Sequence, residues 1–262
     1  MILSRRVTMD GIQLDSLDSR IIISGVEEDV PGETRNALDI YGRIGSRQTF
    51  EHINSKRVTV KFLLKVRKGN FADRNEILEK ITKWARYGSE LRSTTRPGRK
   101  IRVRCTAIPK PTDPRNWTSE YSMTFEAREK PYWENTTTVK ATGTVRASGS
   151  VTLDLDGNLQ NRVTIEAKNM SGAVINNMTL ECGEDSISFT GLGLAADETL
   201  KIGYNTADVQ NIRITGADGK NRSVMDKRTG SDDLRAEPGS VTVSYTAQRA
   251  IQLTAACTGR YA

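Results

Sequence analysis

The sequence is poor in the residues that most enzyme sites need. His52 is the only histidine among 262 residues, so sites that use several imidazoles are excluded. The three cysteines, at 105, 182 and 257, form no C-x-x-C pair, which argues against a zinc site or a disulfide framework. No G-x-S-x-G motif accompanies the histidine. The acidic run EED at 27–29 matches no calcium-loop spacing and is expected to be a solvated loop. We predict no catalytic residue, no metal site and no cofactor, and we do not expect an enzyme.

Long apolar segments are also missing. Apolar residues make up 36% and charged residues 27% of the chain, a composition typical of globular proteins. No uncharged apolar run approaches the roughly 18 residues that cross a bilayer. The N-terminal hexapeptide MILSRR lacks the apolar core of a signal peptide. We therefore expect synthesis in the cytoplasm and no membrane insertion.

Charge and aromatic residues are distributed unevenly along the chain. Residues 1–135 contain 26 Lys and Arg against 18 Asp and Glu, a balance of +8, whereas residues 136–262 contain 13 against 14. Eleven of the 15 aromatic residues, including all three tryptophans, lie in the first part. A change of this size usually marks two domains. We predict a first domain over 1–135 and a second over 136–262.

The first part has the pattern of antiparallel sheets with one helix. Residues 58–66, 101–107 and 121–127 alternate apolar and polar side chains, as in strands with one buried face. Residues 71–87 carry apolar side chains at helical spacing, with Asn70 placed to cap the N-terminus and Gly88 placed as the C′ residue. We predict an α+β first domain within a mainly β chain.

The second part has short alternating strands separated by turns rich in Gly, Asn and Asp. Val241–Tyr245 and Ile251–Leu253 form two of these strands. Asp218-Gly219 is a hairpin signal in which both residues are expected to take positive φ. The number and spacing of the strands predict a β-sandwich of the jelly-roll kind. Phe189 and Tyr245 fall in phase with apolar strand positions, so we expect core packing rather than a sugar-stacking face.

Basic side chains share the polar faces of the predicted strands in the first domain. They could form an electropositive surface that meets phosphate or an acidic protein, or a solvated sheet face. No zinc-finger, RNA-recognition or helix-turn-helix pattern accompanies them. We take them as the candidate subunit or partner contacts: Arg57, Lys61, Lys65, Arg67, Arg102 and Arg104.

The order of segments in the first domain resembles a known family. The helix ends in ITKWAR at 81–86, and it is followed by LRSTTRPGR at 91–99, RNWT at 115–118, YSMTF at 121–125 and PYW at 131–133. Together these segments resemble the distal tail protein (Dit) of long-tailed siphophages, the ring component of the baseplate hub. The second domain is similar in outline to the galectin-like sandwich of that family. It departs from the family at Gly203-Tyr204, where a charged residue is common after the preceding strand.

The resemblance implies a structural virion protein at the distal end of the tail. Six copies would form a closed ring that joins the tail tube protein to the tail-associated lysin or fibre hub protein, with DNA passing through the lumen. Receptor-binding proteins could attach to the second domain. Heterologous contacts of this kind close only if the rotation closes. The aromatic residues near 117–133 fit such an interface, and core packing explains them equally well.

Three alternatives remain open on the sequence. A receptor- or carbohydrate-binding tail accessory protein would use the second domain. A nucleic-acid binder would use the basic first domain and would bind DNA with a steep salt dependence. An enzyme is the least supported class, because no paired catalytic motif is present.

Overall fold

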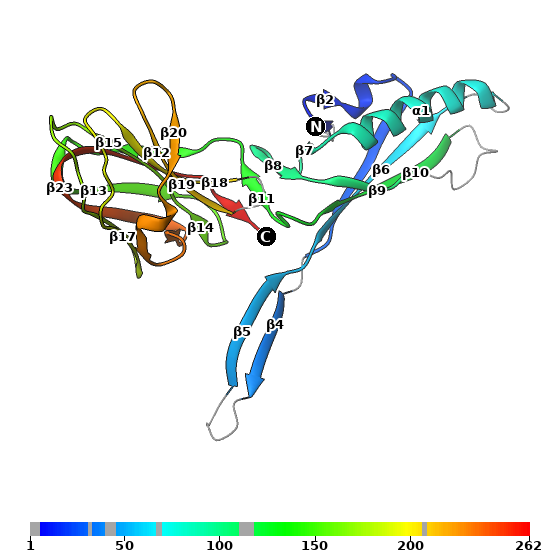
Figure 1. Ribbon diagram of the computed structural model, residues 1–262. Helices are drawn as coiled ribbons and strands as arrows, with labels where there is room; N and C mark the ends of the chain where they lie inside the picture. Colours follow the sequence, from blue (N-terminus) through cyan, green and yellow to red (C-terminus); the bar gives the residue numbers. More distant parts are fainter. Residues whose placement is uncertain (1–5, 31–32, 40–45, 67–69, 110–117, 206–208) are drawn as a thin grey trace. The chain divides into compact units, whose positions relative to one another are not determined.

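The computed structural model describes residues 6–30, 33–39, 46–66, 70–109, 118–205 and 209–262. For 33–39 and 46–53 it describes the backbone alone. The chain divides into two compact units, Met1–Glu134 with Ala262, and Asn135–Tyr261. Figure 1 shows the elements of both units.

Strands dominate both units, and within the described residues α1 (Phe71–Tyr87) is the only α-helix, which confirms the predicted mainly β fold class. A short 3-10 helix, η1 (Leu14–Ser16), follows the second strand. The strands of the first unit are β1 (Val7–Met9), β2 (Ile12–Gln13), β3 (Ile21–Glu28), β4 (Glu33–Asp39), β5 (Ser46–Ile53), β6 (Lys56–Lys65), β7 (Glu90–Ser93), β8 (Arg99–Arg102), β9 (Arg104–Ala107), β10 (Thr118–Ala127) and β11 (Trp133–Asn135).

The first unit contains two main antiparallel sheets and a hairpin. One sheet has the strand order β3-β6-β10-β9, and the other follows the path β2-β1-β7-β8-β11. The strands β4 and β5 pair only with each other among the described residues, between β3 and β6 in the chain. His52 lies in β5, opposite Thr34.

The turn between β1 and β2 is a two-residue hairpin that the sequence analysis missed. Asp10 and Gly11 both take positive φ, 49° and 84°, which is the signature of a type I′ turn. The Asp10 carboxylate accepts hydrogen bonds from the backbone N–H groups of Ser89 (3.0 Å) and Glu90 (2.8 Å). It therefore fastens this turn to the start of β7.

The helix α1 forms as the sequence predicts at its N-terminus and along its buried face. The Asn70 side chain accepts a hydrogen bond from the backbone N–H of Asp73 at 3.3 Å, and Ile77, Ile81 and Trp84 are buried. The Trp84 ring meets Phe125 of β10 edge-on, with ring centroids 6.2 Å apart. The apolar stripe thus packs on the buried face of the sheet.

The C-terminus of α1 differs from the prediction. Gly88 has φ −80° and ψ 151°, so it is extended rather than left-handed. A Cβ atom built at this position would lie 1.8 Å from Cγ of Met9 and 3.1 Å from the carbonyl oxygen of Trp84. Glycine is required here because β1 approaches the helix end closely, not because of a left-handed cap.

Asp18 and Arg20 fasten α1 to the segment before β3. Nε and Nη2 of Arg20 donate to the two carboxylate oxygens of Asp18, each at 2.9 Å, and Nη1 donates to Asp73 of α1 at 3.0 Å. The hydrogen bond from Arg20 lowers the pKa of Asp18 from 3.8 to about 2. Because the folded state holds Asp18 ionised at a pH where the unfolded chain protonates it, this stabilisation is present above pH 3.8 and is lost between 3.8 and about 2.

We therefore expect Asp18→Asn to reduce the free energy of unfolding at pH 7 by roughly 1 kcal/mol, because the pair is partly exposed. The difference from the wild type should shrink as the pH falls from 3.8 through about 2. Tryptophan fluorescence measures it in the first unit alone, since Trp84, Trp117 and Trp133 all lie there. A difference that stays constant across this pH range would contradict the assignment.

The second unit is a curled sheet around one apolar core. Its strands are β12 (Val139–Thr142), β13 (Arg146–Leu155), β14 (Asn161–Arg162), β15 (Thr164–Asn169), β16 (Met178–Cys182), β17 (Asp185–Phe189), β18 (Thr199–Tyr204), β19 (Gln210–Thr215), β20 (Asn221–Ser223), β21 (Arg228–Gly230), β22 (Arg235–Ala236), β23 (Gly239–Cys257) and β24 (Arg260–Tyr261). The short 3-10 helix η2 (Met225–Lys227) precedes β21. Ten strands form one sheet, in which β12 and β13 both pair with β23.

The long strand β23 pairs with four other strands of the curled sheet. Residues 239–247 pair with β13 and β16, and residues 251–257 pair with β12 and β15. The two separate strands predicted for 241–245 and 251–253 are therefore wrong. The residues between them, TAQRA at 246–250, include no Gly or Pro that would interrupt a strand, and β23 continues through them.

The turn at Asp218-Gly219 also differs from the prediction. The hairpin of β19 and β20 is present, but Thr215 pairs with Asn221, so five residues form the loop. Only Gly219 takes positive φ (77°), and its N–H donates to the carbonyl oxygen of Gly216 at 3.0 Å. The longer loop removes the need for a second left-handed residue.

Candidate interaction surface

Three of the candidate contact residues share one face of β6, as the alternating pattern predicts. Arg57 and Lys65 are exposed and Lys61 is half-buried, whereas the apolar residues between them, such as Val60 and Phe62, are fully buried. These cations therefore lie on the outer face of the β3-β6-β10-β9 sheet.

Carboxylates on the neighbouring strands make this face mixed rather than uniformly basic. Glu126 of β10 pairs across the sheet with Arg57 on one side and with Arg104 of β9 on the other. Hydrogen bonds from Arg128 and Ser55 lower the pKa of Glu126, and the charge of Arg57 contributes. The sheet thus brings two of the predicted cations together around one carboxylate.

The lysines of β6 differ in how their charge is compensated. Lys61 forms an ion pair with Glu27 of β3, and this hydrogen bond raises the pKa of Lys61. Lys65 lies opposite Thr118 and has no ion-pair partner among the described side chains. Lys65 is therefore a cation of this strand whose charge no described side chain compensates.

The arginines at 102 and 104 do not share a strand, contrary to the prediction. Arg102 ends β8 and lies opposite Glu90 in one sheet, whereas Arg104 begins β9 in the other sheet. The chain changes sheets at the buried residue Val103, and Cys105 and Ala107 beyond it are not buried. Arg67, the sixth candidate, lies outside the described residues.

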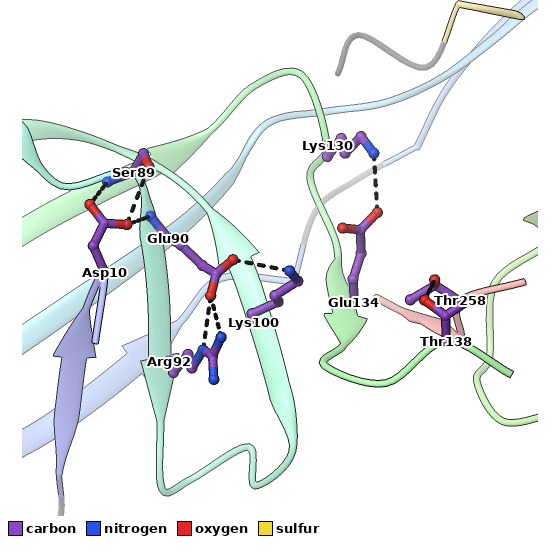
Figure 2. A network of polar contacts seen from close by, with 9 residues as sticks. All are labelled: Asp10, Ser89, Glu90, Arg92, Lys100, Lys130, Glu134, Thr138 and Thr258. Atoms are coloured by element: carbon purple, nitrogen blue, oxygen red, sulfur yellow. Dashed lines mark hydrogen bonds and ion pairs between the residues drawn. The ribbon is translucent and has the colours of Figure 1, made fainter. Parts of the chain in front are cut away.

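Glu90 forms the centre of a polar network on the second sheet, shown in Figure 2. Its carboxylate accepts hydrogen bonds from Nη2 of Arg92 at 2.6 Å and from Nζ of Lys100 at 3.0 Å. Partial burial acts to raise the pKa of Glu90, but the hydrogen bonds from Arg92 and Lys100 outweigh it and lower the pKa. Arg102 lies opposite Glu90 and is exposed, and it forms no ion pair among the described residues.

A partly buried ion cluster joins the two sheets of the first unit. Oε2 of Glu28 accepts from Nε1 of Trp133 at 3.0 Å and from Nη2 of Arg96 at 3.2 Å, and it pairs with Nζ of Lys56 at 3.5 Å. Lys56 is only 2% exposed, and burial lowers its pKa. The solvated loop predicted for 27–29 is therefore wrong, because Glu27 and Glu28 lie in β3 and bind cations.

The aromatic residues of the first unit that the structure describes pack mainly inside it. Tyr132 and Trp133 are buried, and the stacked rings of Phe62 and Tyr121 lie 5.4 Å apart. Their concentration in this half of the sequence thus reflects core packing. Trp117 lies outside the described residues.

The second unit presents no row of exposed aromatic side chains among its described residues. Phe189 and Tyr245 are buried in the core, as predicted. Tyr204 lies in β18 and is partly buried, with the Arg162 guanidinium 5.3 Å from its ring centre. Gly203 and Tyr204 continue β18, so this departure from the family pattern is a strand and not a loop.

Two searches of the described residues bear on other classes of site. No group of three or more His, Cys, Asp or Glu side chains is placed to hold a metal ion. No described helix has the length and the apolar composition that crossing a membrane requires.

Comparison with solved structures identifies the architecture. The structure of SPP1 Dit (gp 19.1), described as a paradigm of the hub adsorption apparatus in phages that infect Gram-positive bacteria, matches with a TM-score of 0.69 at 15% identity, over 98% of this chain and 99% of that chain. The chain has the fold of a distal tail protein. The Dit-like fold extends over both units, since almost the whole of each chain is matched.

Two structures of the phage P2 baseplate in its activated conformation, one with calcium and one with strontium, are less similar. Each has a TM-score of 0.44 at 10% identity, over 96% of this chain and 97% of the other. No family model and no curated protein matches the sequence.

Proposed function

We propose that this chain is a structural subunit of the distal tail hub of a long-tailed phage, where copies of it form a ring between the tail tube and the tail-tip apparatus. The observation that carries the proposal is the Dit-like fold along the full length of the chain, in both units. The expected partners are identical subunits, the tail tube protein and a lysin or fibre hub protein. A closed ring of six copies is the arrangement that we expect.

The surface of the first unit supports association through polar contacts. Lys65 and Arg102 are exposed, and neither forms an ion pair within the described part of the chain. The strand β9 pairs only with β10 among the described strands, so its other edge offers unpaired backbone groups to a neighbour. Such an edge suits heterologous contacts between identical subunits.

The ring itself is tested on the purified full chain, alone and mixed with the tail tube protein. Native mass spectrometry measures the number of copies, and negative-stain images reveal whether they close around a lumen. Closed rings in either sample would support the proposal. A monomer in both samples would overturn it.

The contact role of the free cations has a separate test. We expect Lys65→Glu combined with Arg102→Glu to weaken ring assembly or tube binding by about tenfold or more, because reversed charges would face the groups that these cations meet. Arg146→Glu combined with Lys220→Glu is the matched control, since it makes the same change in net charge at exposed sites of the second unit. Equal assembly by both double variants, with unchanged unfolding temperatures, would exclude Lys65 and Arg102 from the contacts.

The alternative of a carbohydrate-binding accessory protein receives no support from aromatic stacking, because Phe189 and Tyr245 are buried.

A further inference from the structure

A polar hollow of about 420 Å³ lies on the outer face of the curled sheet in the second unit. It is lined by residues of β12, β15, β18, β19 and β23, whose inner faces cover the core. Ligand sites for small molecules have volumes of about 300–1,000 Å³, so the hollow has the size for a molecule such as a monosaccharide phosphate.

The hollow exists because two small residues on this face lie on either side of Thr164. Ala256 of β23 pairs with Thr164 of β15, and the register places Gly203 of β18 beside Thr164 on the other side. Gly203 then pairs with Asn211 of β19. A Cβ atom at Gly203 would meet nothing within 4 Å, so the space above it is open.

The charges beside the hollow are not balanced. Lys201 and Arg213 face each other directly across β18 and β19, and like charges in such a pair are destabilising. Lys201 forms an ion pair with Glu166 at 3.3 Å on its other side. Arg213 and Lys140, which also line the hollow, have no hydrogen-bond or ion-pair partner within the described residues. The lining of the hollow thus carries three cations and one carboxylate, which is already paired with Lys201.

We infer that this hollow binds a phosphorylated sugar or polyol of about monosaccharide size. The phosphate would lie between Arg213 and Lys201, where it would relieve the repulsion of the facing cations, and an arginine can donate two parallel hydrogen bonds to it. The hydroxyl groups would lie over Gly203, within reach of the Asn211 amide and the carboxylate of Glu166. This inference concerns the second unit alone and does not depend on ring formation.

Isothermal titration calorimetry on the full chain tests the site with glucose 6-phosphate, glucose and inorganic phosphate. We expect glucose 6-phosphate to bind with a Kd of about 1 mM or tighter, inorganic phosphate to bind at least several-fold more weakly, and glucose to give no signal. Arg213→Glu should weaken binding at least tenfold. Gly203→Leu should do the same by filling the hollow, and it should fold normally because the added side chain enters open space.

Matched controls separate the site from general effects of charge and size. Arg146→Glu reverses an exposed charge of the same unit, and Gly172→Leu adds the same side chain at a glycine with equally open surroundings outside the hollow. Both should retain wild-type affinity. Failure of the wild type to bind glucose 6-phosphate, equal affinity for inorganic phosphate, or binding that survives both test variants would each overturn the inference. Ring assembly by the same variants is expected to be unchanged. The ligand site and the ring can therefore each be contradicted without contradicting the other.

Discussion

Replacing Gly88 with alanine is expected to lower the free energy of unfolding of the first unit by about 3 kcal/mol, the upper range for overpacking a core. The added methyl carbon would overlap Cγ of Met9, at 1.8 Å, and would press on Sδ of the same residue, at 2.6 Å. Met9 is only 1% exposed and lies in β1, so its side chain has little room to move away. Thermal unfolding followed by tryptophan fluorescence measures the loss in the unit concerned.

Two further variants identify the cause of this loss. Gly88→Asn should be at least as damaging as Gly88→Ala, because asparagine relieves only a left-handed cap and Gly88 is extended. In the double variant Gly88→Ala with Met9→Ala, the contact partner is removed, so the combined loss should fall short of the sum of the single losses by more than 0.5 kcal/mol, the usual size of coupling between touching residues. Additive losses would contradict a clash between these two side chains.

The sequence predicts elements well where one side-chain period continues without interruption. Helix α1 has the predicted bounds and strand β6 has the predicted buried face, because each places a regular row of apolar side chains against one core. A regular alternation of apolar and polar residues does not indicate where the chain passes from one sheet to another. Residues 101–107 alternate without a break, yet the chain passes from β8 to β9 at Val103, because tertiary packing and not local pattern decides which neighbour each half finds.

The candidate surface is predictable in part, for a similar reason. Alternation identifies Arg57, Lys61 and Lys65 as outward-facing, but it contains no information about the strands on either side. The carboxylates that compensate these cations, Glu27 and Glu126, come from β3 and β10, and only the register of the sheet brings them together. A surface that has the composition of a basic patch is thus a mixed surface, on which a few cations have no ion-pair partner among the described side chains.

Glu28 is a residue that sequence reasoning misplaced and that should matter greatly for stability. We expect Glu28→Ala to lower the free energy of unfolding of the first unit by about 4 kcal/mol, because it would remove the carboxylate that pairs with the buried ammonium of Lys56. The indole N–H of Trp133 would lose its acceptor as well. Loss of less than 1 kcal/mol, measured by urea unfolding and tryptophan fluorescence, would contradict a structural role for the cluster.

Lys56→Met provides the matched comparison, since it removes the buried charge while Glu28 keeps its bonds to Arg96 and Trp133. We expect it to cost much less stability than Glu28→Ala. We also expect adding it to Glu28→Ala to recover part of the loss, because no unpaired buried ammonium then remains.

The pH dependence of the stability has a definite sign. Burial lowers the pKa of Lys56 below its value of 10.5 in the unfolded chain, so between the two values the unfolded state binds more protons and stability rises with pH. The free energy of unfolding of the wild type should therefore rise relative to that of Lys56→Met as the pH is raised toward 10. If it falls relative to that of Lys56→Met instead, the charge of Lys56 lies in a favourable, well-solvated site.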